Sequence, residues 1–210
     1  MIARGIAAGS ASSLFKAFVF LALTAPLLAG CGYNTIPTNE ERAKAAWSEV
    51  LNQYQRRADL IPNLVETVKA FAAQEREVLT AVVEARAAAT SIQVSPEMLD
   101  NPEALRAFQE GQANLTGALS RLLAVVEAYP ELKSSQNFLA LQAQLEGTEN
   151  RIAVARRDYI EAVRVYNTSL RTFPSVIWAS LWFTDNEPFA TFTIDEDKME
   201  VPEVDFDQND

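Results

Sequence analysis

The sequence predicts an all-α protein, an antiparallel up-and-down bundle of three long helices, or of four if the first helix breaks at Pro62. The chain has only seven glycines among 210 residues and is about half apolar. Alanine and leucine, which are plentiful, lose little conformational freedom in a helix, whereas glycine loses the most. Apolar residues recur in steps of three and four through the body of the chain, without strand-like alternation. Short connections between such helices favour an antiparallel bundle.

The first helical stripe begins near Thr38, where Thr38 and Glu41 have the spacing of a capping box. Proline lacks an amide hydrogen and clashes with the preceding turn, so Pro62 predicts a kink or break near residues 59–63. The apolar positions of this stripe are Ala43, Trp47, Val50, Tyr54, Ile61, Leu64, Val68, Phe71, Val78, Val82 and Ala85.

Two further stripes follow a turn region at residues 91–102. Ser95-Pro96 and Asn101-Pro102 both offer a capping residue followed by proline at the first helical position. We expect the second helix to end at Pro130 and the third to end at Pro174. Their stripes are Leu105, Phe108, Gln112, Leu115, Leu119, Leu122, Val126 and Tyr129, and Phe138, Leu141, Leu145, Ile152, Ala155, Tyr159, Ala162, Tyr166 and Phe173.

The chain changes character after the predicted bundle, residues 39–174. Residues 175–183 are apolar and aromatic, and Trp178, Trp182 and Phe183 either form a surface that docks on a membrane or partner, or cap the bundle core. Residues 184–210 form an acidic tail with ten acids and one base, which predicts a solvated, irregular extension. Its stretch 189–194 fits a short strand or an extended segment.

Residues 1–30 have the features of a lipoprotein signal peptide. Arg4 and Lys16 are basic, and residues 17–28 are apolar. Twelve residues of helix span only about 18 Å, which is short for a bilayer core of about 30 Å. Residues 28–31 read LAGC, like a lipobox, which predicts lipid attachment at Cys31 and a tether over residues 31–38. The alternative is a conventional cleavage site. Gly32, rather than aspartate, favours the outer membrane as destination.

Residue types restrict the possible chemistry. The chain has one cysteine and no histidine, so Ser-His-Asp and Cys-His arrangements are impossible and histidine zinc sites are excluded. No glycine-rich phosphate loop is present. The net charge of −10 gives no basic surface for nucleic acid. We therefore expect no enzymatic activity, no cofactor, no metal and no nucleic-acid partner.

Arg57 lies on the apolar stripe of the first helix, between Tyr54 and Ile61. A buried guanidinium needs hydrogen-bond partners, and Glu149 or Asp158 on the last helix could supply them. Such a group is either an anion- or peptide-recognition site or a structural ion pair that fixes helix register. The structural interpretation is favoured because buried ion pairs more often specify geometry.

Several segments resemble the LemA family of bacterial envelope proteins. Residues 32–34 (GYN) lead to residues 47–68, which read WSEVLNQYQRRADLIPNLVETV, and later come YPELK at 129–133, LEGTENRI at 145–152, ARRDY at 155–159, YN at 166–167 and FP at 173–174. The resemblance covers residues 32–183. It implies a helical bundle held outside the cytoplasm by an N-terminal membrane anchor, and it implies no reaction. The chain departs from the family in its lipobox, where members commonly have a transmembrane helix, and in Ile160, where they usually have asparagine.

The leading functional hypothesis is a non-catalytic interaction or scaffold module, tethered to the membrane by its N-terminal lipid and holding another envelope protein. The rival is a structural or membrane-remodelling protein that acts by self-assembly and direct lipid contact. The sequence does not indicate the identity of the partner or the oligomeric state.

Overall fold

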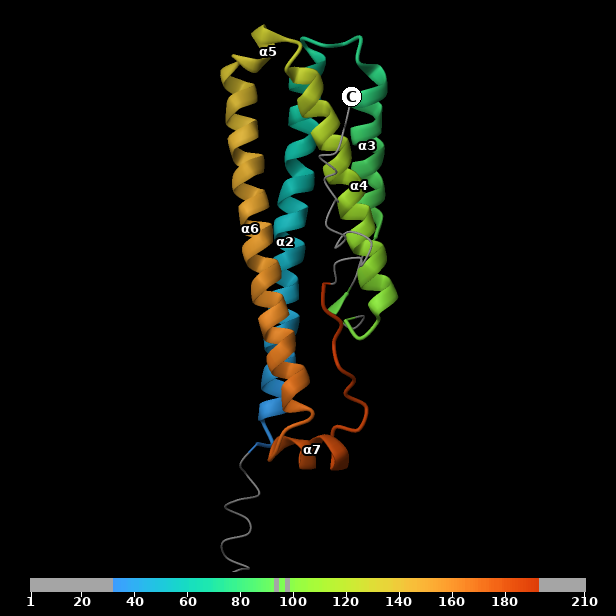
Figure 1. The fold of residues 1–210 in the computed structure, drawn as a ribbon, viewed down its shortest axis with the longest axis vertical. Helices are drawn as coiled ribbons and strands as arrows, with labels where there is room; N and C mark the ends of the chain where they lie inside the picture. The colour runs from blue at the N-terminus through green and yellow to red at the C-terminus, as the bar shows by residue number, and fades with distance from the viewer. Residues whose placement is uncertain (1–31, 93–94, 97–98, 193–210) are drawn as a thin grey trace, which may run out of the picture. The chain divides into compact units, whose positions relative to one another are not determined.

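The computed structural model describes residues 32–92, 95–96 and 99–192 (Figure 1). Within these ranges it has six helices and no strand, which confirms the all-α prediction. They are α2 (Thr35–Lys69), α3 (Arg76–Ser91), α4 (Pro102–Val126), α5 (Pro130–Lys133), α6 (Gln136–Ser169) and α7 (Ser175–Leu181). The predicted signal peptide, Cys31 and residues 193–210 of the acidic tail lie outside the described residues. No helix in the described part of the chain is long and apolar enough to cross a bilayer.

The chain divides into two compact units, and the boundaries fall inside α2 and α6. One unit, which we call the bundle unit, comprises residues 45–161 and the chain from Phe189 onward. It holds most of α2 and α6 together with α3, α4 and α5. The other, the α7 unit, comprises the chain up to Lys44 and residues 162–188, and it contains the first turns of α2, the last turns of α6 and all of α7.

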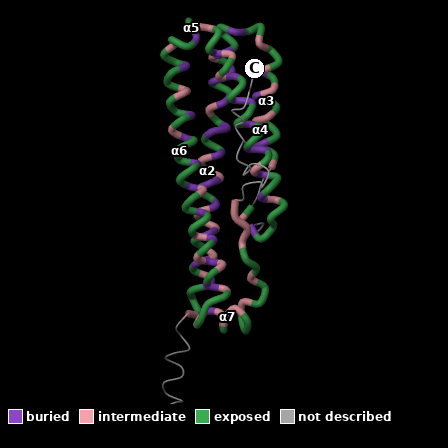
Figure 2. Tube along the Cα trace, in the orientation of Figure 1, coloured by how far each residue is buried: buried purple, intermediate pink, exposed green. Residues whose placement is uncertain are grey.

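In the bundle unit, α2 lies beside α6 and α3 lies beside α4 (Figure 1). Buried positions recur along the helices between exposed ones, as the predicted stripes require (Figure 2). The main core cluster is apolar and draws on all of these helices. It comprises Ile61, Leu64, Val65, Val68, Ala72, Leu79, Val82, Ala89, Leu115, Ala118, Leu119, Leu122, Val126, Leu132, Phe138 and Leu145.

The sequence predicted a kink or a break near Pro62, and the break does not occur. Pro62 lies inside α2, which is continuous from Thr35 to Lys69. A proline at position 62 cannot donate to the carbonyl of Ala58, four residues earlier. Arg86 of α3 donates its Nε–H to that carbonyl at 2.7 Å instead. A side chain from the neighbouring helix therefore satisfies the buried group that the proline leaves without its usual donor.

The break occurs instead at residues 70–75, between α2 and α3. This stretch contains no glycine or proline, so nothing in its composition marks a turn. The corner is fixed by Tyr129, whose hydroxyl donates to Glu75 Oε1 at 2.8 Å and accepts from Gln74 Nε2 at 2.7 Å. Because the helix has already ended, Phe71 is 43% exposed and does not continue the stripe.

Of two predicted helix starts, the one at Asn101 is confirmed and the one at Thr38 is wrong. Asn101 caps α4 as expected, accepting hydrogen bonds from the backbone amides of Glu103 and Ala104, with Pro102 as the first helical residue. The capping box at Thr38 is wrong, because α2 begins three residues earlier at Thr35. Buried Ile36 extends the apolar stripe into that additional turn, so part of the predicted tether is helical.

The hydrogen bond from Arg86 to Ala58 should make Arg86 and Pro62 thermodynamically coupled. We expect Arg86→Met to lower the free energy of unfolding by about 1–3 kcal/mol, because the buried carbonyl loses its donor. In a Pro62→Ala background the restored amide can donate to Ala58, so the loss should shrink to less than about 1 kcal/mol. Urea denaturation followed by circular dichroism measures both values. The exposed Arg76→Met is the matched control, and strictly additive effects of the two substitutions would contradict the coupling.

Candidate interaction site

Arg57 forms the polar centre of the bundle unit and is 2% exposed. Its Nη1 donates to Glu149 Oε1 of α6 at 2.7 Å and to Thr116 Oγ1 of α4 at 3.2 Å. Its Nη2 donates to Gln112 at two points, the side-chain oxygen at 2.5 Å and the backbone carbonyl at 3.4 Å. The guanidinium carbon also lies 5.0 Å from the centre of the Tyr54 ring. One side chain thus connects α2, α4 and α6.

Arg57 forms an ion pair with Glu149. Asp158, the other predicted partner, lies at a different site. Asp158 is exposed and lines a separate groove of about 300 Å³ between α2 and α6, together with Glu49, Gln53, Asn150, Arg151, Val154 and Ala155. The side chain of Glu149 is 48% exposed, so the buried cation is balanced by a carboxylate that reaches solvent. This asymmetry limits the desolvation cost of the pair, because only one of the two charges leaves water.

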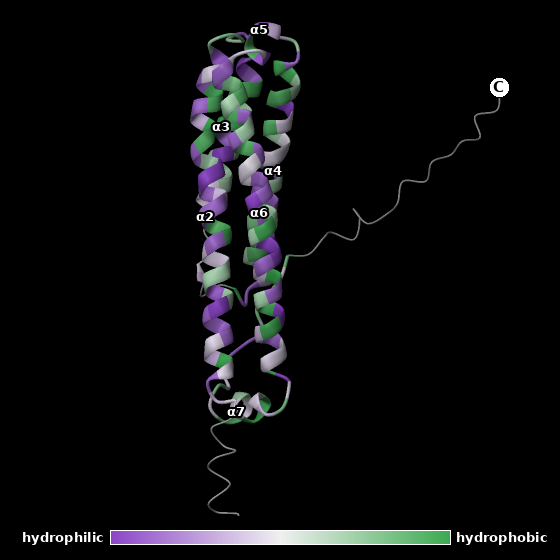
Figure 3. Ribbon diagram, turned by 90° about the vertical axis from the view of Figure 1, so that its left-hand side faces the viewer, coloured by the Kyte–Doolittle hydropathy of each residue, from purple (hydrophilic) through white to green (hydrophobic). Residues whose placement is uncertain are grey.

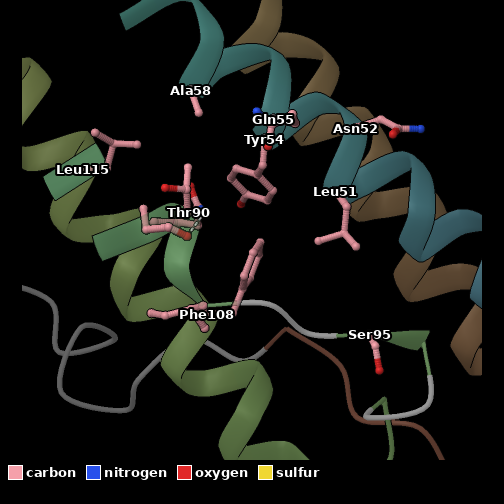
Figure 4. Close-up of a pocket in the computed structure, with 12 residues that line it drawn as sticks. Leu51, Asn52, Tyr54, Gln55, Ala58, Thr90, Ser95, Phe108 and Leu115 are labelled. Atoms are coloured by element: carbon pink, nitrogen blue, oxygen red, sulfur yellow. Dashed lines mark hydrogen bonds between the residues drawn. The ribbon is translucent and has the colours of Figure 1, made fainter. Parts of the chain in front are cut away.

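A groove of about 380 Å³ opens beside the Arg57 centre, between α2, α3 and α4 (Figure 4). Gln112 belongs to both features: its amide oxygen accepts from Arg57, and its Nε2 donates to the carbonyl of Ala89 at 3.5 Å. Among the residues that the structure describes, the lining carries apolar, amide and hydroxyl groups but no ionisable acid or base apart from the Tyr54 phenol. It consists of Leu51, Asn52, Tyr54, Gln55, Ala58, Ala89, Thr90, Ile92, Ser95, Phe108, Gln112 and Leu115.

Tyr54 and Phe108 connect this groove to a cluster of aromatic rings. Their rings meet edge to face with centroids 5.1 Å apart (Figure 4), and Trp47 lies 5.4 Å from Phe108 and 5.1 Å from Tyr159. Burial raises the pKa of the Tyr54 phenol above its ordinary value, although Arg156 and Arg57 nearby oppose the shift. Tyr54 is therefore protonated at neutral pH, so the groove offers a neutral hydroxyl.

Residues 189–192 complete the aromatic cluster, so the tail packs at these four positions, whereas Thr184, Asp185, Glu187 and Pro188 before them are exposed, as a solvated tail requires. The Phe192 ring lies 5.9 Å from Trp47 and 5.6 Å from Tyr159, and the guanidinium of Arg156 lies 4.3 Å from its centre. Residues 189–192 lie in neither a helix nor a strand. Its backbone is held at Ala190, whose carbonyl accepts from the Tyr159 hydroxyl at 2.8 Å and whose amide donates to the carbonyl of Leu99 at 2.7 Å.

The α7 unit contains the predicted docking residues. Trp178 and Phe183 are half-buried, and each packs against Tyr33 with ring centroids 5.4 Å apart, whereas Trp182 is 64% exposed. The neighbouring chain is held by polar contacts: Asn186 donates to Glu40 Oε2 at 2.9 Å and to the Tyr166 hydroxyl at 3.1 Å. Two of the three predicted residues therefore pack within this unit and one faces outward.

Sequence reasoning missed Gln112, Thr116 and the groove. Gln112 stands on an apolar stripe of α4, and a polar residue at such a position is a usable indication of a buried hydrogen-bond partner. The sequence gave no comparable indication of the groove, because the residues that line it come from three helices and a connection and are far apart in the chain. In the described part of the chain no cluster of three or more acidic or cysteine side chains is arranged to hold a metal.

The fold and the site define a class of protein: a bundle of long helices with a buried arginine centre, an uncharged groove and a docked aromatic segment. The LemA family model matches residues 46–206, and the chain belongs to the LemA family. The resemblance found in the sequence motifs is thereby confirmed.

The chain is also similar to three proteins that are named as magnetosome proteins. It is 30% identical over 158 residues to Magnetosome protein MamQ 2 of Paramagnetospirillum magneticum, and as similar to MamQ 1 of the same organism. It is 26% identical over 160 residues to Magnetosome protein MamQ of Magnetospirillum gryphiswaldense. Each match covers 68% of this chain and 58% of the relative, so the chain spans less than two thirds of the length of these proteins.

The ion pair predicts a specific sensitivity to Glu149. Glu149→Gln leaves the guanidinium of Arg57 buried without its counter-charge, and we expect the free energy of unfolding to fall by about 1–3 kcal/mol. Glu146→Gln is the matched control, because Glu146 is exposed and accepts from Gln142, one turn away on its own helix. Chemical denaturation of both variants measures the difference, and equal stability of the two would show that the pair does not stabilise the bundle.

The buried phenol of Tyr159 predicts a loss of stability at alkaline pH. Burial raises its pKa above the ordinary value of 10.0. Above that pH the unfolded phenol ionises while the folded one keeps its proton, so the unfolded state binds fewer protons and the free energy of unfolding decreases. Tyr159→Phe should lower stability by about 1 kcal/mol at neutral pH, because the hydrogen bond to Ala190 is lost, and should make the alkaline decrease shallower. Melting temperatures measured across this range test both effects; parallel curves for the two proteins would refute the second.

Proposed function

We propose that this LemA-family protein is a lipid-anchored, non-catalytic interaction module of the bacterial cell envelope. The observation that carries the proposal is the uncharged groove beside the Arg57 centre. Its volume of about 380 Å³ falls in the range of small binding sites. Arg57 holds Gln112 on one wall, and the ring of Phe108 is fixed against Tyr54 and Trp47, so the groove is built on ordered side chains.

The chemistry of the groove indicates its occupant. Leu51, Phe108 and Leu115 offer apolar surface, the Asn52 amide can donate to and accept from a peptide backbone, and the Thr90 hydroxyl, which donates within its own helix, can accept from it. A lining without charged side chains does not favour an anion or a cation. An apolar segment of an envelope protein, with its backbone amides, is the ligand that satisfies both kinds of group.

The proposed location rests on the N-terminal sequence. The basic residues, the short apolar stretch and the lipobox support export and acylation at Cys31, and membership of the LemA family supports an envelope protein. The absence of aspartate after the cysteine supports the outer membrane as the destination. The relatives are named as magnetosome proteins, which supports an association with a membrane-linked cellular structure.

Site-specific crosslinking in intact cells tests the proposal. A photo-reactive phenylalanine analogue at Gln55, on the rim of the groove, should crosslink to one recurring envelope protein. The same analogue at Val83 is the matched control, because Val83 is 50% exposed on α3 and does not line the groove. In a Cys31→Ser variant the protein should leave the membrane fraction and the Gln55 crosslink should weaken, since the tether no longer concentrates the protein beside its partner.

The outcomes separate the two functional classes. Identical crosslinks from Gln55 and Val83 would mean that the groove is not the binding surface. Crosslinks only between copies of this chain would reject the interaction module and favour the alternative, a structural or membrane-remodelling protein that works by self-assembly.

A further inference from the structure

The α7 unit exposes an apolar surface around a helix that carries no charged residue. Ile177 and Leu181 are four positions apart and therefore share one face of α7. Their exposed fractions are 44% and 62%, and the flanking Phe173 and Trp182 are 78% and 64% exposed. Figure 3 shows green, hydrophobic residues on this helix. We call these four residues, Phe173, Ile177, Leu181 and Trp182, the α7 surface.

The α7 surface is presented by an ordered segment. Ser175 is buried, and its hydroxyl donates to the carbonyl of Ser169 at 2.7 Å, which ties the start of α7 to the end of α6. On the inner side, Trp178 packs edge to face against Tyr33 and lies 5.5 Å from Trp182. The contacts of Ser175 and Trp178 therefore hold α7 in place, and its outward-facing side chains are exposed as a result of the fold.

The start of the described chain lies directly beside this helix. Gly32 has a φ of 98°, and a Cβ built on it would lie 3.1 Å from Pro174 Cγ and 3.5 Å from the amide nitrogen of Ser175. Cys31 precedes Gly32 by one peptide bond, about 3.8 Å between Cα atoms. If Cys31 carries the lipid, the acyl chains therefore leave the protein within a few ångströms of the first residues of α7.

We propose that the α7 surface lies in the interfacial region of the same bilayer that holds the lipid anchor, giving the protein a second, adjacent membrane contact. This inference rests on the proposed acylation of Cys31. The occupant is a phospholipid surface, because the chain that joins the patch to Cys31 brings the membrane to it. Tryptophan and phenylalanine suit this position since their rings favour the boundary between headgroups and acyl chains.

Charge sets the kind of lipid that this contact requires. The exposed Arg171 precedes the patch, and Asp185 and Glu187 follow it, so the surroundings carry no excess of basic groups. An amphipathic membrane helix that selects anionic lipid needs a basic face. The α7 surface should therefore engage zwitterionic phosphatidylcholine, and the contact should depend little on salt.

Tryptophan fluorescence tests the contact directly, because the chain has only three tryptophans. The full-length protein, purified from membranes, is reconstituted into phosphatidylcholine vesicles that carry a spin-label quencher at the upper end of an acyl chain. Trp182 should be quenched, while fully buried Trp47 should keep its emission. Trp182→Phe should remove at least about half of the quenched emission, since Trp178 is partly covered and contributes less.

Two substitutions of exposed leucine provide a matched pair. Leu181→Ser should reduce quenching of Trp182, because the patch loses a large part of its apolar area. Leu139→Ser, which replaces a 49% exposed leucine on α6, should leave quenching unchanged. Circular dichroism confirms that both variants keep their helices.

The anchor and the α7 contact give separate readouts. The mass of the N-terminal peptide reports acylation of Cys31, and quenching reports the contact. Acylated, vesicle-bound protein whose Trp182 emission is insensitive to the quencher would overturn the α7 proposal and leave the anchor standing. Quenching without acylation would support the α7 contact and reject the anchor. Equal quenching in Leu181→Ser and wild type would also count against the α7 surface.

Discussion

The buried guanidinium of Arg57 is the constraint on which the rest of the bundle unit depends. A cation removed from water is tolerated only where its hydrogen bonds are supplied in a fixed geometry. Gln112 and Thr116 of α4 and Glu149 of α6 supply them to the two Nη atoms, so these helices must keep one register relative to α2. Apolar stripes alone would tolerate sliding by one helical turn, because leucine and valine pack acceptably in several registers. The hydrogen bonds of Arg57 also determine the shape of the groove, because Gln112 accepts from Arg57 and forms part of the groove wall.

The helices could be predicted from sequence because their stripes are long and regular, and Trp47, Tyr54 and Leu115 are buried as the spacing requires. The prediction failed where distant residues decide local structure. Pro62 continues in a helix because Arg86 compensates for the missing amide, and the corner at residues 70–75 forms because Tyr129 holds Gln74 and Glu75. Neither donor is near in sequence, so local rules for proline and turns could not have found them.

The candidate site, too, could be predicted only in part from the sequence. The position of Arg57 on an apolar stripe was sufficient to predict a buried cation with Glu149 as partner. The choice between Glu149 and Asp158 depended on how α6 turns relative to α2, which periodicity does not specify. Trp178 and Phe183 were noticed as aromatic residues, but their packing against Tyr33 could not be anticipated because Tyr33 lies more than a hundred positions earlier. Charge composition suggested a solvated tail, whereas the few aromatic residues within it decided that residues 189–192 pack.

The docking of Phe192 has a consequence for how the molecule is made. Trp47 and Tyr54 are synthesised early, yet the ring cluster around them is incomplete until Phe192 emerges, 145 positions after Trp47. Chains grow from the N-terminus, so a nascent chain has an open aromatic surface until the segment that contains Phe192 has been synthesised. The order of synthesis therefore keeps this part of the core from closing before residues 189–192 are available to pack against Trp47 and Tyr159.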